Sequence, residues 1–134
     1  MINYKKFKNI LFKALPILFM GSLFSQPTVA VLDFEANGLP GYEVETLVER
    51  LRSEIPNTKA MRLVDRKMLE NILKEQGLQQ SGCTTEECAA EIGELLGAQF
   101  MISGSVGKLG STFSVDAKMV SVSTGEMTRT KSVS

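Results

Sequence analysis

Apolar residues of this chain gather into three short stretches of strand length, at residues 29–34, 61–64 and 99–106. The first is a near-continuous apolar run, which predicts a strand that is covered on both faces. Gly104 interrupts the last run, which indicates a bulge or a close approach of another segment. Residues 37–41 are rich in turn formers and separate the first strand from the next element.

Residues 42–55 have the spacing of an amphipathic helix. The apolar residues that recur every three or four positions are Val44, Leu47, Val48, Leu51 and Ile55. The charged residues between them, which are expected to face water, are Glu43, Glu45, Glu49, Arg50, Arg52 and Glu54. Pro56 is expected to end the helix, because the residue before a proline disfavours helical geometry.

Two further helices are predicted before residue 98. Asp65 can cap a helix over residues 67–76, and Gly77 stands just past its end. Thr84 and Glu87 have the spacing of a capping box, which opens a helix that runs to about residue 96. Its predicted apolar face consists of Cys88, Ile92 and Leu95, flanked by Ala89 and Leu96.

The last part of the chain has the pattern of an antiparallel meander. Residues 113–122 begin with alternating apolar side chains, residues 123–126 fit a hairpin turn, and residues 127–134 form a mostly polar return strand. Loops this short join antiparallel strands. The order of elements predicts an α/β (α+β) fold, with a single mixed sheet of about five strands, helices packed on it and a C-terminal antiparallel hairpin.

The first 25 residues are typical of a secretory signal peptide. A basic stretch precedes an apolar run that Lys13 and Pro16 interrupt, and this run is shorter than the roughly 20 apolar residues of a comfortable membrane span. We therefore expect an exported domain over residues 26–134. The alternative is that the leader stays attached as a membrane anchor.

Charge is distributed unevenly between these two parts. The chain has 15 basic and 15 acidic residues, and four lysines but no acidic residue lie in the leader. Residues 26–134 hold 11 basic and 15 acidic groups, a net charge of −4. An acidic domain without a basic run is poorly suited to binding nucleic acid, because neutralising phosphates needs clustered lysine or arginine.

The residue types argue against an enzyme. The chain has no histidine, which removes the usual general base of nucleophilic catalysis and all imidazole metal ligands. Asp33 and Glu35 follow the first strand, where α/β enzymes often place acids, but they also fit the solvent-facing end of that strand. We expect no catalytic residue, no metal, no cofactor and no small-molecule substrate.

Cys83 and Cys88 are the only cysteines. In an exported protein, an even pair this close predicts a small disulfide, which would stabilise the fold by no more than about 2–3 kcal/mol. Free thiols and a redox-active pair are the alternatives, although the spacing is not that of a CxxC motif.

Several segments resemble the CsgG/HfaB family of periplasmic domains, known from the curli secretion channel. The matching segments are VAVLDF at 29–34, RLVDRKMLENILKEQ at 62–76, AQFMISGSV at 98–106 and MVSVSTGEM at 119–127. Together they cover about residues 28–134 and imply a CsgG-like, anticodon-binding-domain-like fold. The family would continue into a further helix, so the chain is expected to be truncated there.

The resemblance implies a non-enzymatic envelope protein that works through contacts with itself or with other envelope proteins. The main hypothesis is a component of outer-membrane assembly or transport of the curli type, periplasmic and peripheral to the outer membrane. The alternatives are a regulatory adaptor of the LpoB type, which activates a peptidoglycan synthase, and a flagellar accessory protein of the FlgO or FlgT type. The expected interface is the edge strand, with residues Met127, Thr128, Arg129, Thr130 and Lys131.

Overall fold

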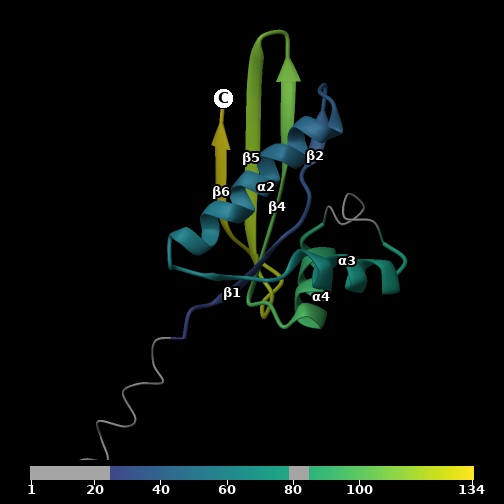
Figure 1. Ribbon diagram of the computed structural model, residues 1–134, viewed down its shortest axis with the longest axis vertical. Coiled ribbons are helices and arrows are strands. Elements are labelled where there is room, and N and C mark those ends of the chain that lie inside the picture. Colours follow the sequence, from purple (N-terminus) through teal and green to yellow (C-terminus); the bar gives the residue numbers. More distant parts are fainter. Residues whose placement is uncertain (1–24, 79–84) are drawn as a thin grey trace, which may run out of the picture.

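Six strands form one mixed sheet with helices packed against it (Figure 1). The computed structural model describes residues 25–78 and 85–134. The strands are β1 (Thr28–Val31), β2 (Glu35–Asn37), β3 (Arg62–Leu63), β4 (Phe100–Leu109), β5 (Thr112–Ser121) and β6 (Met127–Val133). The helices in these ranges are α2 (Gly41–Asn57), α3 (Arg66–Glu75) and α4 (Glu86–Leu96). The predicted α/β (α+β) class is confirmed.

The strands lie in the order β3-β1-β4-β5-β6, and β2 pairs with the second half of β4. β1 runs parallel to β3 and β4, whereas β4, β5 and β6 are antiparallel neighbours, as their short turns predict. The sheet has six strands rather than about five because the sequence pattern does not predict β2. The first predicted strand, residues 29–34, is also longer than β1. β1 ends at Val31, and the chain pairs with β4 again only in β2, whose three residues carry no apolar pattern.

β1 is buried on both faces, which explains its unbroken apolar run. One core, shared with α3 and α4, contains Ala30, Leu32, Leu69, Leu73, Ala89, Ile92, Leu96, Ala98 and Met101. A second core, shared with α2, contains Val31, Phe34, Val44, Val48 and Val106. The helices therefore cover the part of the sheet around β1 from both sides.

Local sequence signals set the ends of the helices. The Asp65 carboxylate accepts hydrogen bonds from the backbone amides of Lys67 and Met68, at 2.8 and 3.3 Å, as predicted. Gly97 ends α4 with a φ of 66°. The cap of α4 is Thr85, whose hydroxyl accepts the Cys88 amide at 3.1 Å. The prediction of Thr84 as the cap, which lies outside the described residues, is therefore wrong by one position.

The buried face of α4 also differs from the predicted one. Its buried residues are Ala89, Ile92, Gly93 and Leu96, whereas Leu95 is 50% exposed. A Cβ added at Gly93 would come within 2.5 Å of the Val122 side chain. α4 thus approaches the sheet most closely at Gly93, because a larger side chain there would collide with Val122.

In the described parts of the chain, no helix combines the length and the apolar character that crossing a membrane requires. Residues 1–24, nearly all of the predicted leader, lie outside those parts. The signal peptide and its alternative, a retained anchor, therefore stay predictions.

Gly104 is the site of the close approach that the sequence indicates. A Cβ there would meet the backbone oxygen of Asp116 at 2.1 Å and the ring of Phe34 at 2.7 Å. We predict that Gly104→Ala lowers the free energy of unfolding by about 1–3 kcal/mol, because the backbone and the ring must both move. Urea denaturation of the exported domain measures this change.

The matched control is Gly41→Ala at the start of α2, where nothing lies within 4 Å of an added Cβ. This control is expected to preserve or raise stability, because alanine loses less backbone entropy in a helix than glycine does. Unchanged stability in Gly104→Ala would contradict the close packing of Phe34 on β4.

Candidate functional site

Strand β6 is the most exposed element of the sheet. All seven of its residues, MTRTKSV, are exposed. It lies at the end of the strand order and pairs with β5 on one side, and no strand within residues 25–78 and 85–134 pairs with its other side (Figure 1). The five residues of the predicted interface, Met127, Thr128, Arg129, Thr130 and Lys131, all lie on this strand. Their role as an interface stays a prediction.

Register assigns each side chain of β6 to one face of the sheet. Arg129 lies opposite Met119, Lys131 opposite Ala117, and Val133 opposite Val115. Ala117 and Val115 pack against the core under α2, and residues opposed in an antiparallel pair point to the same face. Arg129, Lys131 and Val133 therefore lie on the α2 face of the sheet.

A shallow groove of about 390 Å³ lies beside these cations. The half-buried side chains of Ile102, Ala117 and Met119 supply its apolar lining, and its charged lining residues are Lys118, Arg129 and Lys131. Neither Arg129 nor Lys131 forms an ion pair with a residue of the described ranges. An apolar centre with a polar rim is the arrangement found in protein interfaces.

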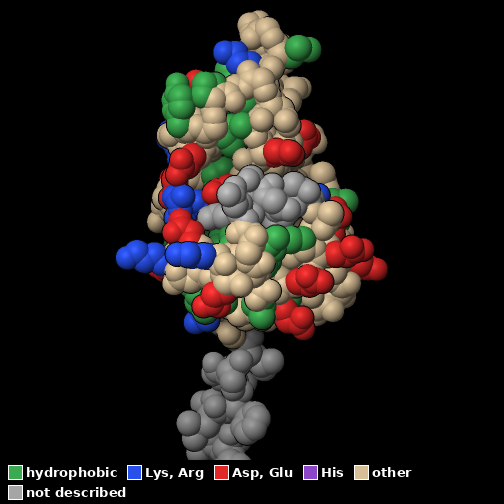
Figure 2. Space-filling model, turned by 90° about the vertical axis from the view of Figure 1, so that its right-hand side faces the viewer, with side chains coloured by type: hydrophobic (Ala, Val, Ile, Leu, Met, Phe, Trp, Pro, Cys, Tyr) green, Lys and Arg blue, Asp and Glu red, His purple; other side chains and the backbone are tan. Residues whose placement is uncertain are grey.

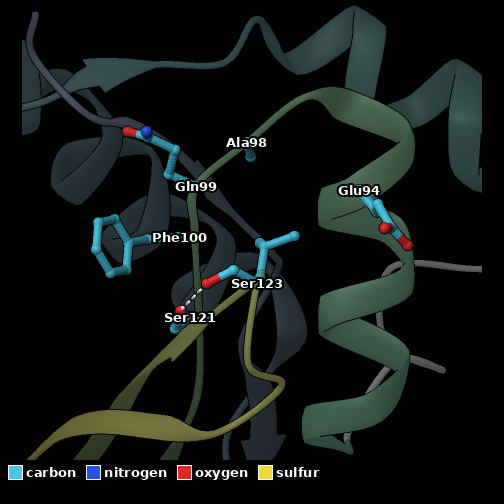
Figure 3. A pocket seen from close by; sticks show the side chains of 7 residues that line it. Glu94, Ala98, Gln99, Phe100, Ser121 and Ser123 are labelled. Carbon is cyan, nitrogen blue, oxygen red and sulfur yellow. Dashed lines mark hydrogen bonds between the residues drawn. The ribbon is translucent and has the colours of Figure 1, made fainter.

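A second pocket, of about 370 Å³, lies where α4 ends and β4 begins. Its lining residues are Glu94, Ala98, Gln99, Phe100, Ser121, Val122 and Ser123. Figure 3 shows the Gln99 and Phe100 side chains pointing away from Glu94, while the Ser121 and Ser123 hydroxyls, 3.2 Å apart, hydrogen-bond to each other. The polar groups do not converge on one point, so this pocket offers no reacting centre.

Of the two carboxylates after β1, Asp33 has a structural partner. Asp33 forms an ion pair with Arg52 at 2.9 Å, and the same guanidinium donates to the backbone oxygen of Val31 at 2.7 Å. Arg52 is only 6% exposed. The expectation that Arg52 faces water is therefore wrong, and so is the expectation that Asp33 is simply a solvent-facing strand end. Glu35 is exposed on β2, as expected.

The network continues from Arg52 into α3. Glu49 accepts hydrogen bonds from both Arg52 and Arg66, and Arg66 also reaches Glu45 at 3.1 Å and Glu70 at 2.8 Å. The hydrogen bond to Glu45 raises the pKa of Arg66 most, against a lowering by desolvation, and Glu70 and Glu49 raise it further. Three of these ion pairs connect the end of β1 to α2 and α2 to α3, and the other two lie within a helix.

One sequence signal does point to the role of Arg52. Val44, Val48 and Arg52 follow one another at intervals of four residues, so all three lie on the buried face of α2. A charged residue in line with a buried stripe needs partners, because an unpaired buried charge is costly. Hydrophobic spacing alone selects Leu47 for this stripe, although Leu47 is 49% exposed.

Another ion pair ties α4 to β5. The Lys118 ammonium lies 3.1 Å from a carboxylate oxygen of Glu86, in the first turn of α4. The pKa of Glu86 is lowered by a hydrogen bond from its own backbone amide and by Lys118. This contact holds the start of α4 on the face of the sheet opposite α2.

The described residues contain no group of three or more acidic, histidine or cysteine side chains that could hold a metal ion. The chemistry within reach of the candidate site is therefore that of β6: unpaired strand backbone, two cations and an apolar groove.

The family model described as "Curli production assembly/transport component CsgG" matches residues 20–114. The chain belongs to the CsgG family. The resemblance inferred from the sequence segments is thereby confirmed. No curated protein sequence matches the chain significantly.

Several solved structures share the fold. The LpoB C-terminal domain from Salmonella enterica is 21% identical with a TM-score of 0.66, over 90% of this chain and 90% of that one. Escherichia coli LpoB is 18% identical with a TM-score of 0.70, over 83% of this chain and 57% of that one. Lipoprotein GNA1162 from Neisseria meningitidis is 12% identical with a TM-score of 0.63, over 79% and 77%. At these identities the likeness establishes the fold alone.

We predict that Arg52→Met lowers the free energy of unfolding by about 2–4 kcal/mol. Methionine keeps the apolar stem but removes the hydrogen bond to the Val31 oxygen and the ion pair with Asp33. The matched control is Arg50→Met on the exposed side of the same helix, for which a change within about 0.5 kcal/mol is expected. Equal urea midpoints for the two variants would contradict a structural role for Arg52.

The disulfide is a separate prediction. Cys88 stands in the first turn of α4 beside the core, while Cys83 lies outside the described residues. Domain isolated from the periplasm is expected to react with a thiol reagent only after reduction, as a mass shift for two cysteines. Alkylation of the folded or denatured domain without reduction would contradict the bond.

Proposed function

We propose that this chain is a non-enzymatic protein of the cell envelope that binds other proteins through β6, as a component of outer-membrane assembly or transport. One observation carries the proposal: a seven-residue strand at the edge of the sheet, exposed along its whole length, beside an apolar groove with a basic rim. A free strand edge accepts a strand of another chain by forming new backbone hydrogen bonds.

Several features favour protein binding over chemistry on a small molecule or binding of nucleic acid. Asp33 is held in an ion pair with Arg52, and the polar groups of the pocket beside α4 diverge. The chain also has no histidine, and the net charge of −4 over residues 26–134 disfavours nucleic acid. We propose that the domain uses no metal and no cofactor.

An envelope location is supported by the family description and by the leader. The family is described by curli production, assembly and transport. The leader pattern of residues 1–25 would bring the domain to the periplasm. We propose a periplasmic protein that attaches peripherally to the outer membrane.

The alternative is an adaptor that binds a cell-wall enzyme, in the manner of LpoB-type proteins. It is favoured by the extent of the fold match, because the LpoB C-terminal domain and this chain each overlap over 90% of their length. In addition, the turn between β4 and β5 has only two residues, so it holds no large insertion.

Photo-crosslinking in the producing cells tests the proposal. A photoreactive amino acid in place of Thr130 on β6 is expected to give adducts with one or a few envelope proteins. The control position is Glu91, an exposed residue on α4. Adducts from Thr130 but not from Glu91 support binding through β6, because only the first probe lies on the strand edge.

The identity of the adduct separates the two candidates. An outer-membrane assembly or export protein, or ring-sized oligomers of the purified domain, supports the first function. A cell-wall synthase supports the adaptor. The absence of adducts at Thr130, or the same adducts from both positions, would overturn binding through β6.

A further inference from the structure

The two cations of β6 have a regular placement. Arg129 and Lys131 are two residues apart on the α2 face, and Val133, 57% exposed, follows on the same face. The side chains that alternate with them, Thr130 and Ser132, lie on the other face and are small and neutral. A strand added at the outer edge of β6 would therefore meet the series cation, cation, apolar residue along one face.

A second copy of β6 does not complement this series when the α2 faces of both copies lie on the same side. Antiparallel pairing with Thr130 opposite Thr130 then places Arg129 opposite Lys131. Sliding one strand by two residues places Arg129 opposite Arg129, or Lys131 opposite Lys131. Every such register with five or more paired residues puts a cation directly opposite a cation, and like charges at that distance are destabilising.

We propose, on the basis of the proposed binding through β6, that the partner is an extended segment of a different protein with two carboxylates two residues apart. These carboxylates lie opposite Arg129 and Lys131, and an apolar side chain two residues further lies opposite Val133. The partner segment thus has the alternation acid-x-acid-x-apolar if it runs parallel to β6, and the reverse order if it runs antiparallel.

Charge elsewhere on the domain strengthens this choice. Acidic side chains are spread over the face shown in Figure 2, and the exposed residues of α3 and α4 include Glu70, Glu75, Glu87, Glu91 and Glu94. An acidic segment is repelled from such surfaces and attracted to β6, where the cations have no partner in the described ranges. The two charged positions also set the register, because a slip of one residue moves both carboxylates to the opposite face.

The test uses a peptide of known sequence, Val-Thr-Glu-Thr-Glu-Thr-Val with blocked ends, which reads the same in both directions. Its matched control replaces both glutamates by lysine. NMR titration of the exported domain measures even weak affinities and locates the contact. The glutamate peptide is expected to shift the amide signals of β6 and to bind about two- to thirty-fold more tightly than the lysine peptide, with a difference that shrinks in salt.

Charge reversal supplies the second arm. The double variant Arg129→Glu, Lys131→Glu is expected to invert the preference, so that the lysine peptide binds more tightly. The control variant Lys67→Glu, Lys74→Glu changes the net charge equally on α3 and is expected to keep the preference for glutamate. Sharp, dispersed spectra of each variant establish that it is folded.

Three other outcomes would overturn the inference, and each contradicts a different part of it. Equal binding of both peptides at β6 would refute the carboxylate pattern while leaving protein binding through β6 intact. A dimer of the exported domain that the double variant alone abolishes would identify a second copy as the occupant. If no peptide shifts β6 and Thr130 gives no crosslink in cells, the proposed function fails together with the inference.

Discussion

The guanidinium group of Arg52 takes the place of a missing neighbour strand. In a parallel pair, alternate residues of a strand direct their backbone groups to the same side, so Val29 and Val31 both face β3. The Val29 oxygen accepts the Val64 amide at 2.8 Å, but the chain then turns at Asp65 into α3. Arg52 supplies the donor that the Val31 oxygen would otherwise lack, and it holds Asp33 at the same time. α2 is thereby fixed to the end of β1.

Anchoring α2 at β1 determines which part of the sheet stays open. α2 covers one face of the sheet around β1 and β4, and α3 and α4 cover the other face. Close packing at Gly93 and Gly104 brings α4 and Phe34 onto the sheet without a gap. The described helices therefore use their apolar surface around β1 and β4, and all seven residues of β6 stay exposed. The groove at β6 stays exposed because both cores are built around β1 and β4, away from this edge of the sheet.

The sequence predicts those features that are set by neighbouring residues. The Asp65 cap and the turn before β6 depend on local geometry, and the structure has both. The buried Arg52, the packing of α4 along Gly93 and the short β2 depend on contacts between distant segments. Hydrophobic spacing ranks leucine above glycine and arginine, so it selects Leu47 and Leu95, which are exposed. The order of the elements along the chain is enough to predict that β6 lies at an edge of the sheet. To predict which face carries Arg129, the strand register is also needed.

The same two cations give β6 both protection and selectivity. An edge strand that is long, flat and uncharged pairs with any similar strand, including its own copies, and lysine on an edge is a common safeguard against this. On β6 the safeguard is positional, because Arg129 and Lys131 share one face and are two residues apart. Two copies of β6 repel each other in every antiparallel register that has five or more paired residues and places their α2 faces on the same side. A segment with carboxylates at the matching spacing instead gains both charge pairs and the backbone hydrogen bonds. Charge spacing on an otherwise neutral strand therefore disfavours antiparallel self-pairing of β6 and favours recognition of a complementary partner.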